Sequence, residues 1–324
     1  MSAIVVVGAG RMGRGIAQVF AYAGQDITIL DIKDRPLDDL PGLFDAGRTE
    51  ISESLSFMAQ AGVFDATLIP NILARVRFAG REDAAKVLGQ AELVFEGVPE
   101  RQDAKEEAFA FICTHLPDDA IIASTTSTML SDMLAKFVTH PERFLNAHWL
   151  NPAYLVPLVE VSPAAETSEK VVEKVMDLLN EVGKVPVRCK ASPGYIIPRL
   201  QTVLINEAVR IVEENVASVE DVDKAVRYGL GLRFATMGPI EFIDWGGLDI
   251  LYYASRYMTE ATGSDRFQAP DSVAEKMQAG DIGMSSGKGY YDFSKIDVEA
   301  YKRDMLARFV DQVRNLGLLK PPAA

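Results

Sequence analysis

The chain has 324 residues, more than one typical hydrophobic core accommodates, so we expect two domains. Hydrophobic residues make up 48% and charged residues 24%, the composition of a globular rather than a disordered protein. The formal net charge of −13 argues against nucleic acid or an anionic membrane surface as a partner.

The N-terminal residues run directly into a hydrophobic strand, without the basic region and cleavage site of a secretion signal. No segment reaches the roughly 18 to 20 apolar residues that a membrane span needs. Cys113 and Cys189 lack metal-ligand spacing, which favours two thiols in a reducing compartment and no metal site. We therefore expect a soluble, cytoplasmic protein.

The start of the chain, as far as Asp31, has the pattern of a strand–turn–helix–strand unit. Ala3–Val7 is a short, apolar, β-branched run, typical of a strand buried on both faces of a parallel sheet. Glycines follow at once, Arg11–Ala23 is predicted to be a helix, and Asp26–Asp31 is predicted to be the next strand. This order within about 30 residues is that of a βαβ crossover.

Helical patterns and short apolar runs alternate from there as far as Cys189, beginning with a helix predicted over Leu43–Ala61. After a turn at Ala191–Gly194 the pattern is mainly helical, with clusters from Tyr195, over Val219–Tyr228 and over Pro239–Thr259. This order predicts an α/β Rossmann-type doubly wound sheet followed by an all-α domain. We expect an NAD-binding domain at residues 1–190 and a helical substrate and dimerisation domain at 191–324. The further predicted strands are Val76–Phe78, Leu93–Glu96, Ala120–Ala123, Arg143–His148, Val156–Val161 and Val185–Cys189.

A glycine fingerprint, Gly8-Ala9-Gly10-Arg11-Met12-Gly13, lies between the first strand and the first helix, which is the context that dinucleotide binding requires. Gly8 allows a tight turn, Gly10 allows a pyrophosphate to approach the backbone, and Gly13 allows close helix packing. Free N–H groups at the start of the helix, including those near Arg11 and Met12, then face the phosphates. The alternative is a glycine-rich turn that binds nothing.

Asp31 ends the second strand, roughly 20 residues beyond the glycine fingerprint, where an acid binds the ribose hydroxyls. Its carboxylate would repel the additional phosphate of NADP, so we expect NAD as the cofactor. Lys33 and Arg35 lie nearby and are interpreted as solvated loop charges.

A histidine and an acid follow on two strands in the second half of the sheet. His148 ends one strand, and Glu160 lies within the next apolar strand. Alcohol oxidation needs a base for the hydroxyl proton, and a histidine titrates near neutral pH. A carboxylate at the far ring nitrogen would fix the tautomer and stabilise the imidazolium. A buried structural histidine is the alternative, but a carboxylate within an apolar strand needs a buried partner.

These residues resemble the 3-hydroxyacyl-CoA dehydrogenase family over nearly the whole chain. Its histidine–x–x–asparagine–proline signature is matched by His148, Asn151 and Pro152, and its following acid by Glu160. The resemblance implies that His148 is the base, that Glu160 orients it, and that Asn151 contacts substrate.

Further segments carry the same resemblance. Ser124–Ser127 matches the family's serine-rich strand end, which implies that Ser127 bonds the substrate oxygen. Glu96–Glu100 with Lys105 matches the segment beside the nicotinamide ribose, which implies cofactor contacts from Glu100 and Lys105. Ser192–Tyr195 resembles the entry to the helical domain, and family membership implies a homodimer through that domain. The closing motif is matched by Gly283, Gly287, Gly289 and Tyr290–Phe293.

Two departures concern the substrate. The acyl-CoA enzymes carry a substrate-binding asparagine where this chain has Pro198, which has no side-chain donor. Their helical hairpin after the second strand is rich in lysine and faces the CoA phosphates. Here no lysine occurs between Lys33 and Lys86, and the hairpin carries Glu50 and Glu53. Carboxylates are poor partners for a polyanion.

Gly231–Pro239 resembles the branch of the family that includes lambda-crystallin, a gulonate dehydrogenase. Members of the wider family also oxidise carnitine and hydroxymethyl-pyridine carboxylates, none of which carries CoA. Arg233 is a candidate partner for a substrate carboxylate, or alternatively for an interdomain or subunit salt bridge. Trp149 is a candidate aromatic wall of the pocket, with core packing as its alternative.

Three functions stay open from the sequence. The first is an NAD-dependent dehydrogenase of a small hydroxy acid or alcohol with a carboxylate. The second is the same chemistry on a short 3-hydroxyacyl-CoA. The third is a non-catalytic NAD-binding or structural protein, which the intact pair of His148 and Glu160 disfavours.

Overall fold

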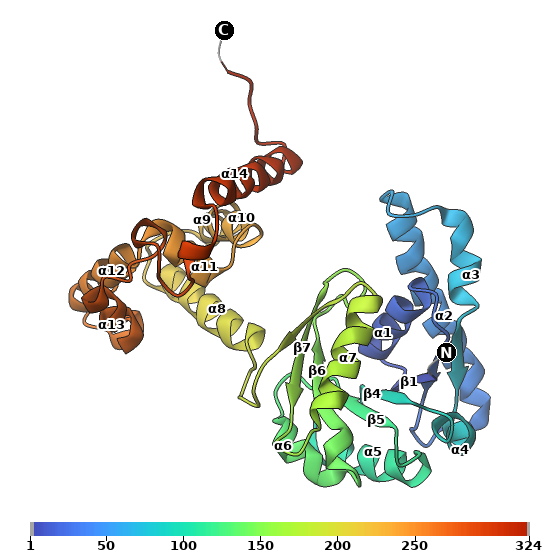
Figure 1. Ribbon diagram of the computed structural model, residues 1–324. Coiled ribbons are helices and arrows are strands. Elements are labelled where there is room, and N and C mark those ends of the chain that lie inside the picture. The colour runs from blue at the N-terminus through green and yellow to red at the C-terminus, as the bar shows by residue number, and fades with distance from the viewer. Residues whose placement is uncertain (1–2, 323–324) are drawn as a thin grey trace. The chain divides into compact units, whose positions relative to one another are not determined.

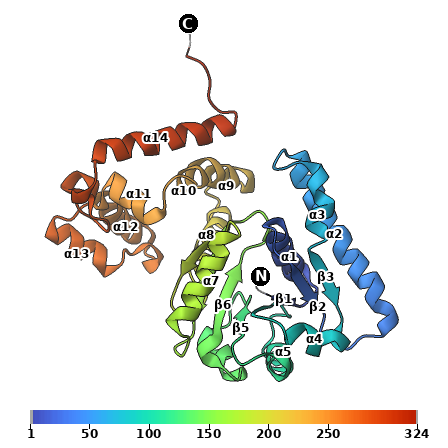
Figure 2. The ribbon, with the colours of Figure 1, turned by 45° about the vertical axis from the view of Figure 1, so that its right-hand side comes forward.

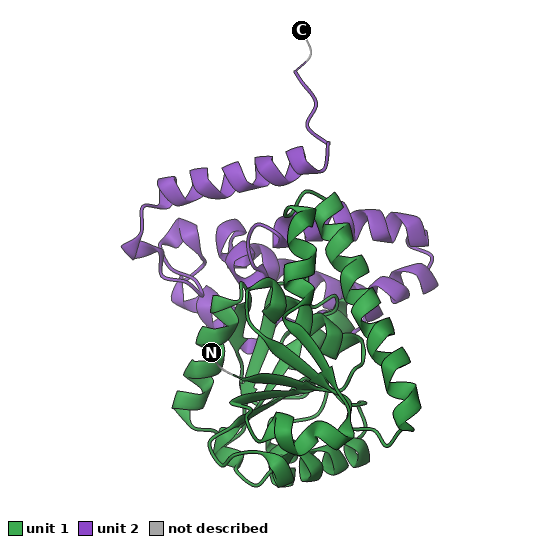
Figure 3. Ribbon diagram, turned by 90° about the vertical axis from the view of Figure 1, so that its right-hand side faces the viewer, with its two compact units in different colours: residues 1–204 green, residues 205–324 purple. Residues whose placement is uncertain are grey.

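The computed structural model describes residues 3–322 and divides into two compact units, one ending at Leu204 and one beginning at Ile205 (Figure 3). Helix α8 (Ile197–Glu213) runs from the first unit into the second. Within residues 3–322, none of the helices combines the length and the apolar character needed to cross a bilayer.

An eight-stranded sheet in the order β3-β2-β1-β4-β5-β6-β7-β8 forms the centre of the first unit (Figure 1). β1 to β6 are parallel, whereas β7 pairs antiparallel with β6 and parallel with β8. All eight strands expected from the sequence form, and the expected Rossmann-type fold class is confirmed. The strands are β1 (Ile4–Val7), β2 (Ile27–Leu30), β3 (Val76–Ala79), β4 (Leu93–Glu96), β5 (Ile121–Ser124), β6 (Phe144–Trp149), β7 (Leu158–Pro163) and β8 (Val185–Arg188).

Helices cover both faces of this sheet (Figure 2). The central strands are buried along their whole length, as the unbroken apolar run of β1 predicts. One apolar core lies between the sheet and α1, α2, α3 and α7, and a second lies between the sheet and α4, α5 and α6. These helices are α1 (Arg11–Tyr22), α2 (Leu40–Gln60), α3 (Ile69–Leu73), α4 (Ala84–Leu88), α5 (Gln102–His115), α6 (Ser131–Leu134) and α7 (Glu169–Glu181).

Strand order reverses between β1 and β4, so the loops at their carboxyl ends diverge and leave space for a ligand. The glycine turn follows β1, Asp31 follows β2, and Glu96 ends β4. The residues singled out for cofactor binding therefore meet at one edge of the sheet. β6, which carries His148, lies two strands beyond β4 in the same sheet.

Helices make up most of the second unit, as expected, but their boundaries differ from the prediction. The helical cluster predicted over Pro239–Thr259 forms two helices, because Gly247 between them has a φ of 107°, in the left-handed region. The helical cluster predicted over Val219–Tyr228 begins as an α-helix and continues as a π-helix over Val226–Gly231. The helices are α9 (Val219–Ala225), α10 (Leu232–Phe234), α11 (Pro239–Gly246), α12 (Leu248–Thr262), α13 (Asp271–Ala279) and α14 (Val298–Asn315).

The closing glycine motif wraps around one buried carboxylate. Asp244 on α11 accepts hydrogen bonds from the backbone N–H groups of Tyr290 (3.0 Å) and Tyr291 (2.7 Å). A Cβ atom at Gly289 would lie 2.2 Å from that carboxylate. The motif therefore requires glycine because Asp244 occupies the space of a side chain, which is a structural role within the second unit.

Candidate active site

The turn after β1 has the geometry of a phosphate cradle. Gly8 has a φ of 110°, and a Cβ atom there would lie 2.7 Å from the Gly97 carbonyl oxygen. A Cβ atom at Gly13 would lie 2.0 Å from the Gly8 carbonyl oxygen, so α1 packs against the turn only with glycine there. At Gly10, by contrast, no atom lies within 4 Å of a Cβ position. This open position suits a group that approaches the backbone, as a pyrophosphate does.

The side chains within the fingerprint diverge. Arg11 is exposed, whereas Met12 packs against the apolar core, so only the backbone of Met12 can face a phosphate. The first turn of α1 has no side-chain cap and no acidic residue. Its free N–H groups and positive dipole end are therefore available to an anion.

Asp31, at the end of β2, is 3% exposed and accepts a hydrogen bond from the Lys33 backbone N–H at 3.2 Å. Arg35 pairs with the other carboxylate oxygen, Nε to Oδ2, at 2.6 Å. The interpretation of Arg35 as a solvated loop charge is therefore wrong, because its guanidinium forms an ion pair with Asp31. The Lys33 side chain is exposed, as expected.

Next to Asp31 lies a pocket of about 510 Å³ that the sequence did not indicate. Its lining includes Ile32 and Val98 from the loops after β2 and β4. Arg81 stands 4.1 Å above the Phe111 ring centre and donates to the Ile32 carbonyl, which makes a flat wall. A pocket with apolar and charged walls next to Asp31 fits the adenine end of a dinucleotide. The residues present thus fit NAD at both the pyrophosphate and the ribose.

His148 and Glu160 are direct cross-strand neighbours. The antiparallel register of β6 and β7 places them opposite each other, and His148 Nδ1 lies 2.7 Å from Glu160 Oε2. Both are buried, at 4% and 0% exposed. This bond commits Nδ1 and leaves Nε2 as the ring nitrogen available to a substrate.

The second carboxylate oxygen of Glu160 is also occupied. It accepts hydrogen bonds from the backbone N–H groups of Ile196 and Ile197, each at 2.8 Å, at the start of α8. Burial raises the pKa of Glu160, but the hydrogen bonds from His148, Ile197 and Ile196 outweigh it, and the pKa lies below its ordinary value. Glu160 is therefore a fixed anion with both oxygens assigned.

Ser127 lies on the exposed segment after β5, and its backbone N–H donates to Glu100 at 3.0 Å. The same Glu100 oxygen accepts from the hydroxyl of Thr126 and from the N–H and hydroxyl of Thr128. Burial raises the pKa of Glu100, but the Thr126 bond, the Lys105 charge and the Thr128 bonds hold it below the ordinary value. Glu100 thus holds the backbone of Ser127 and Thr128 and the side chain of Thr126.

Lys105 is 1% exposed, and its Nζ lies 3.0 Å from each carboxylate oxygen of Glu96. The same Nζ lies 3.6 Å from Oε2 of Glu100. The side chain therefore anchors the β4 end from within the protein, and the prediction that it contacts the cofactor directly needs correction. Breaking such a buried pair from one side costs roughly 3–5 kcal/mol.

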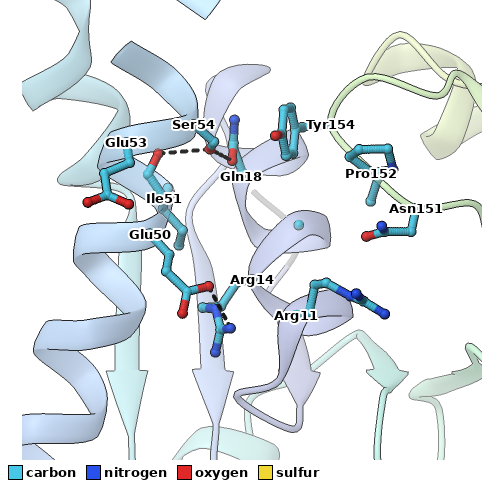
Figure 4. A pocket seen from close by; sticks show the side chains of 12 residues that line it. Arg11, Arg14, Gln18, Glu50, Ile51, Glu53, Ser54, Asn151, Pro152 and Tyr154 are labelled. Atoms are coloured by element: carbon cyan, nitrogen blue, oxygen red, sulfur yellow. Dashed lines mark hydrogen bonds and ion pairs between the residues drawn. The ribbon is translucent and has the colours of Figure 1, made fainter. Parts of the chain in front are cut away.

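A pocket of about 360 Å³ lies beside the loop that follows β6, with Asn151 in its wall (Figure 4). Arg14 on α1 pairs with Glu50 on α2 at 2.6 Å. Arg11 lies at the side of the Asn151 loop, and Glu53 lies on the α2 side. The pocket is thus lined by two arginines and two glutamates. Arg14 and Glu50 form an ion pair with each other, which leaves Arg11 and Glu53 as the other two charges.

Two predicted substrate contacts have different outcomes. Trp149 is 2% exposed and packs in the core against Phe20 and Phe95, so its prediction as a pocket wall is wrong. Alternation along β6 explains this, because Trp149 points to the opposite face from His148. Arg233, in the second unit, is exposed with its guanidinium 5.1 Å from the Phe242 ring centre, and it pairs with no carboxylate within residues 3–322.

Sequence reasoning missed two supports of the site. Lys184 is 7% exposed and donates to the carbonyls of Ala153 and Val156, in the loop after β6. Burial lowers the pKa of its ammonium group. Asn146 lies two residues before His148 on the same face of β6, which was the available signal for it.

The Rossmann-type sheet, the glycine turn after β1 and the acid Asp31 at the end of β2 together define the class of protein. It is a dinucleotide-binding oxidoreductase. Comparison with known families agrees. The family model of the 3-hydroxyacyl-CoA dehydrogenase NAD binding domain matches residues 3–192, and that of the C-terminal domain matches residues 194–293. The chain belongs to the 3-hydroxyacyl-CoA dehydrogenase family and is an NAD-dependent dehydrogenase acting on a CH–OH group.

Relatives of both substrate types are similar to this chain. A 5-formyl-3-hydroxy-2-methylpyridine 4-carboxylate 5-dehydrogenase of Mesorhizobium japonicum is 29% identical, over 95% of this chain and 96% of the relative. A 3-hydroxybutyryl-CoA dehydrogenase of Mycobacterium tuberculosis is 33% identical, over 89% of this chain and 97% of the relative. The crystal structure of a 3-hydroxyacyl-CoA dehydrogenase from Archaeoglobus fulgidus has a TM-score of 0.78 and 30% identity, covering 98% of this chain and 100% of that one.

Proposed function

We propose that this enzyme oxidises a small hydroxy acid or alcohol that carries a carboxylate and no CoA. The charge of the α2–α3 hairpin is the observation that carries the proposal. Between Leu40 and Leu73 the chain has one basic residue, Arg48, against four acids, a net charge of −3. Arg48 lies with its guanidinium 5.6 Å from the Phe78 ring centre. The acids are Asp45, Glu50, Glu53 and Asp65.

Electrostatics weigh against a CoA tail here. Two unit charges about 10 Å apart in water interact by about 0.4 kcal/mol, and salt reduces this about threefold at that distance. A CoA tail has roughly four negative charges, so each hairpin acid other than Glu50, which is paired, opposes it by roughly 0.6 kcal/mol. Arg14 offers little compensation because Glu50 already pairs with it. A small carboxylate with one charge meets only a quarter of this repulsion.

The chemistry follows from the fixed tautomer. His148 takes the hydroxyl proton at Nε2, because Nδ1 is bonded to Glu160. Glu160 stabilises the imidazolium that results and keeps the ring in place. Ser127 holds the substrate oxygen, and Asn151 contacts substrate from the next loop. The residues that would hold NAD are Gly8, Gly10, Gly13, Asp31 and the Glu100 segment, and the bound cofactor would supply the hydride acceptor.

Arg233 is the proposed partner of the substrate carboxylate. Its guanidinium is exposed and has no carboxylate partner within the described part of the chain, which leaves the N–H groups along its edge for a ligand. The 5-formyl pyridine carboxylate that names the Mesorhizobium relative is likewise a small carboxylate without CoA, with an aldehyde in place of the alcohol. Replacing Arg233 with Gln should raise KM for such a substrate about 10- to 100-fold.

A short-chain 3-hydroxyacyl-CoA remains the second candidate, because the Mycobacterium relative named for it is 33% identical. The two candidates share the base and the cofactor and differ in the substrate tail. The deciding experiment follows NADH oxidation with acetoacetyl-CoA beside a panel of free keto acids and aldehydes. We expect turnover of the free compounds. Turnover of the thioester alone would refute the proposal, and NADH binding without any turnover would indicate a structural NAD-binding protein.

We also propose that residues 1–190 bind NAD, and that residues 191–324 form the helical domain through which the enzyme dimerises. The apolar face of α12 supports a partner, since Tyr253 and Tyr257 are 64% and 72% exposed. Replacing Ile250 and Tyr257 together by Asp should convert a dimer into monomers in light scattering. A monomeric wild-type protein would contradict this part of the proposal.

A further inference from the structure

Tyr195 combines an unusual backbone with full burial. Its φ is 43°, in the left-handed region, which a bulky aromatic residue rarely adopts. It is 4% exposed and lies just before α8. Such a conformation is unfavourable and persists only where the surroundings determine it, often at functional sites.

The ring of Tyr195 stacks on the base. Its centre lies 5.2 Å from that of the His148 ring, and the two planes differ by 23°. Glu160 holds the edge of the same imidazole through Nδ1, while the tyrosine covers its face. The two N–H groups after Tyr195 bind Glu160, so the strained residue places both the stack and the carboxylate.

The hydroxyl of Tyr195 reaches a different loop. It accepts a hydrogen bond from Asn146 Nδ2 at 2.8 Å and can donate its one proton to the carbonyl of Thr126, at 3.1 Å, or of Met129, at 3.3 Å. Asn146 Nδ2 also donates to the Met129 carbonyl at 2.8 Å. Thr126 and Met129 flank Ser127. Burial raises the pKa of the phenol, which therefore stays protonated and acts as a bonding group.

We propose that Tyr195 is a positioning residue, which holds the His148 ring and the Ser127 segment in one arrangement. Its ring fixes the face of the base, and its hydroxyl fixes the backbone that carries the oxygen-binding serine. This inference rests on the proposed roles of His148 and Ser127, but not on whether the substrate carries CoA. Its two parts are separable by two substitutions.

Tyr195→Phe keeps the ring and removes the hydroxyl. We expect kcat/KM to fall about 10-fold, with NADH affinity within about twofold and the pH profile unmoved, since one network of hydrogen bonds is lost. Tyr195→Leu removes the ring as well. An aromatic face stabilises a cation above it, so the acid limb of the kcat/KM profile should move by about 0.5 pH unit to lower pH. A purely structural role would lower activity without moving that limb.

The assay uses acetoacetyl-CoA or the free keto acid that wild-type enzyme reduces fastest, so a wrong substrate class does not affect the outcome. NMR titration of the His148 ring protons, assigned with His148→Gln, gives the same comparison without any substrate. Matched thermal unfolding confirms that each variant is folded. Wild-type kcat/KM in Tyr195→Phe, or unchanged titration in Tyr195→Leu, would overturn the proposal.

Discussion

Glu160→Gln should inactivate the enzyme by reversing the tautomer of its base. In the wild type, Oε1 of Glu160 accepts two backbone N–H groups, from Ile196 and Ile197. A glutamine side chain has one oxygen, and that oxygen must take this position, because an NH₂ group there would face two donors. The amide NH₂ then points at His148 Nδ1, which becomes an acceptor. Nε2 carries the proton and can no longer take one from the substrate.

Two estimates bound the magnitude, and they are not multiplied because both describe the loss of the same imidazole base. A hydrogen bond to a charged group is worth about 1.5–3 kcal/mol, or about 10- to 100-fold in rate if it is lost in the transition state. General base catalysis contributes on the order of 10² to 10⁴-fold, and the wrong tautomer removes it. We therefore expect kcat to fall by on the order of 10² to 10⁴-fold. Glutamate and glutamine have nearly the same shape, so packing should change little.

Steady-state NADH oxidation measures the effect, with NADH binding followed separately by fluorescence. Glu166→Gln is the matched control, since this residue is exposed in the same domain and should keep activity within about twofold. Near-normal kcat in Glu160→Gln, in a folded protein with normal NADH affinity, would refute the tautomer argument and remove the pair from the mechanism.

Further predictions concern cofactor, loop and pH. Gly10→Ala should weaken NADH binding at least 10-fold without lowering the unfolding temperature, whereas Gly13→Ala, whose Cβ meets backbone at 2.0 Å, should lower both. Equal stability of the two variants would contradict this. Lys184→Met should cost about 1–3 kcal/mol in urea unfolding because it strands two carbonyls in the loop after β6, and an unchanged midpoint would show that water replaces the ammonium. Glu160 has a lowered pKa in the folded state, so its contribution to stability is complete above its ordinary value of 4.5 and is lost as pH falls through the lower folded value. Glu160→Gln should therefore lose less stability than wild type below about pH 4.5, and parallel acid unfolding curves would contradict this.

The fold could be predicted from sequence because its signals are local. Unbroken β-branched runs such as Ile4–Val7 lie in a sheet buried on both faces, and glycine followed by a helical pattern marks the turn. Helix boundaries in the second unit were harder to predict from the sequence. Gly247 interrupts an apolar pattern that continues through it, and only its backbone angle separates two helices.

The pair of His148 and Glu160 could be predicted, although the distance between them could not. A carboxylate in an apolar strand signals a buried partner, and the antiparallel register of β6 and β7 then places the two residues opposite each other. The prediction for Trp149, by contrast, was wrong. Its position next to the base in sequence suggested a pocket wall, but adjacent residues on a strand face opposite sides.

Residues that act through long-range contacts escaped prediction. Lys184 reaches two carbonyls that lie far from it in the chain, at sequence separations of 31 and 28. Arg81 and Phe111 come from different βα units and meet only in the folded protein. No local pattern distinguishes these side chains from solvated ones.

The central claim, that the substrate carries no CoA, is tested most directly by the ratio of kcat/KM for acetoacetate to that for acetoacetyl-CoA. This pair shares one keto group and differs in the tail. We predict a ratio above one in the wild type, and a rise in acetoacetyl-CoA activity of about sevenfold in Glu53→Lys, which changes the hairpin by two charges. Glu260→Lys, in the second unit, is the control for net charge. A ratio far below one, unaffected by Glu53→Lys, would contradict the account and identify an acyl-CoA enzyme.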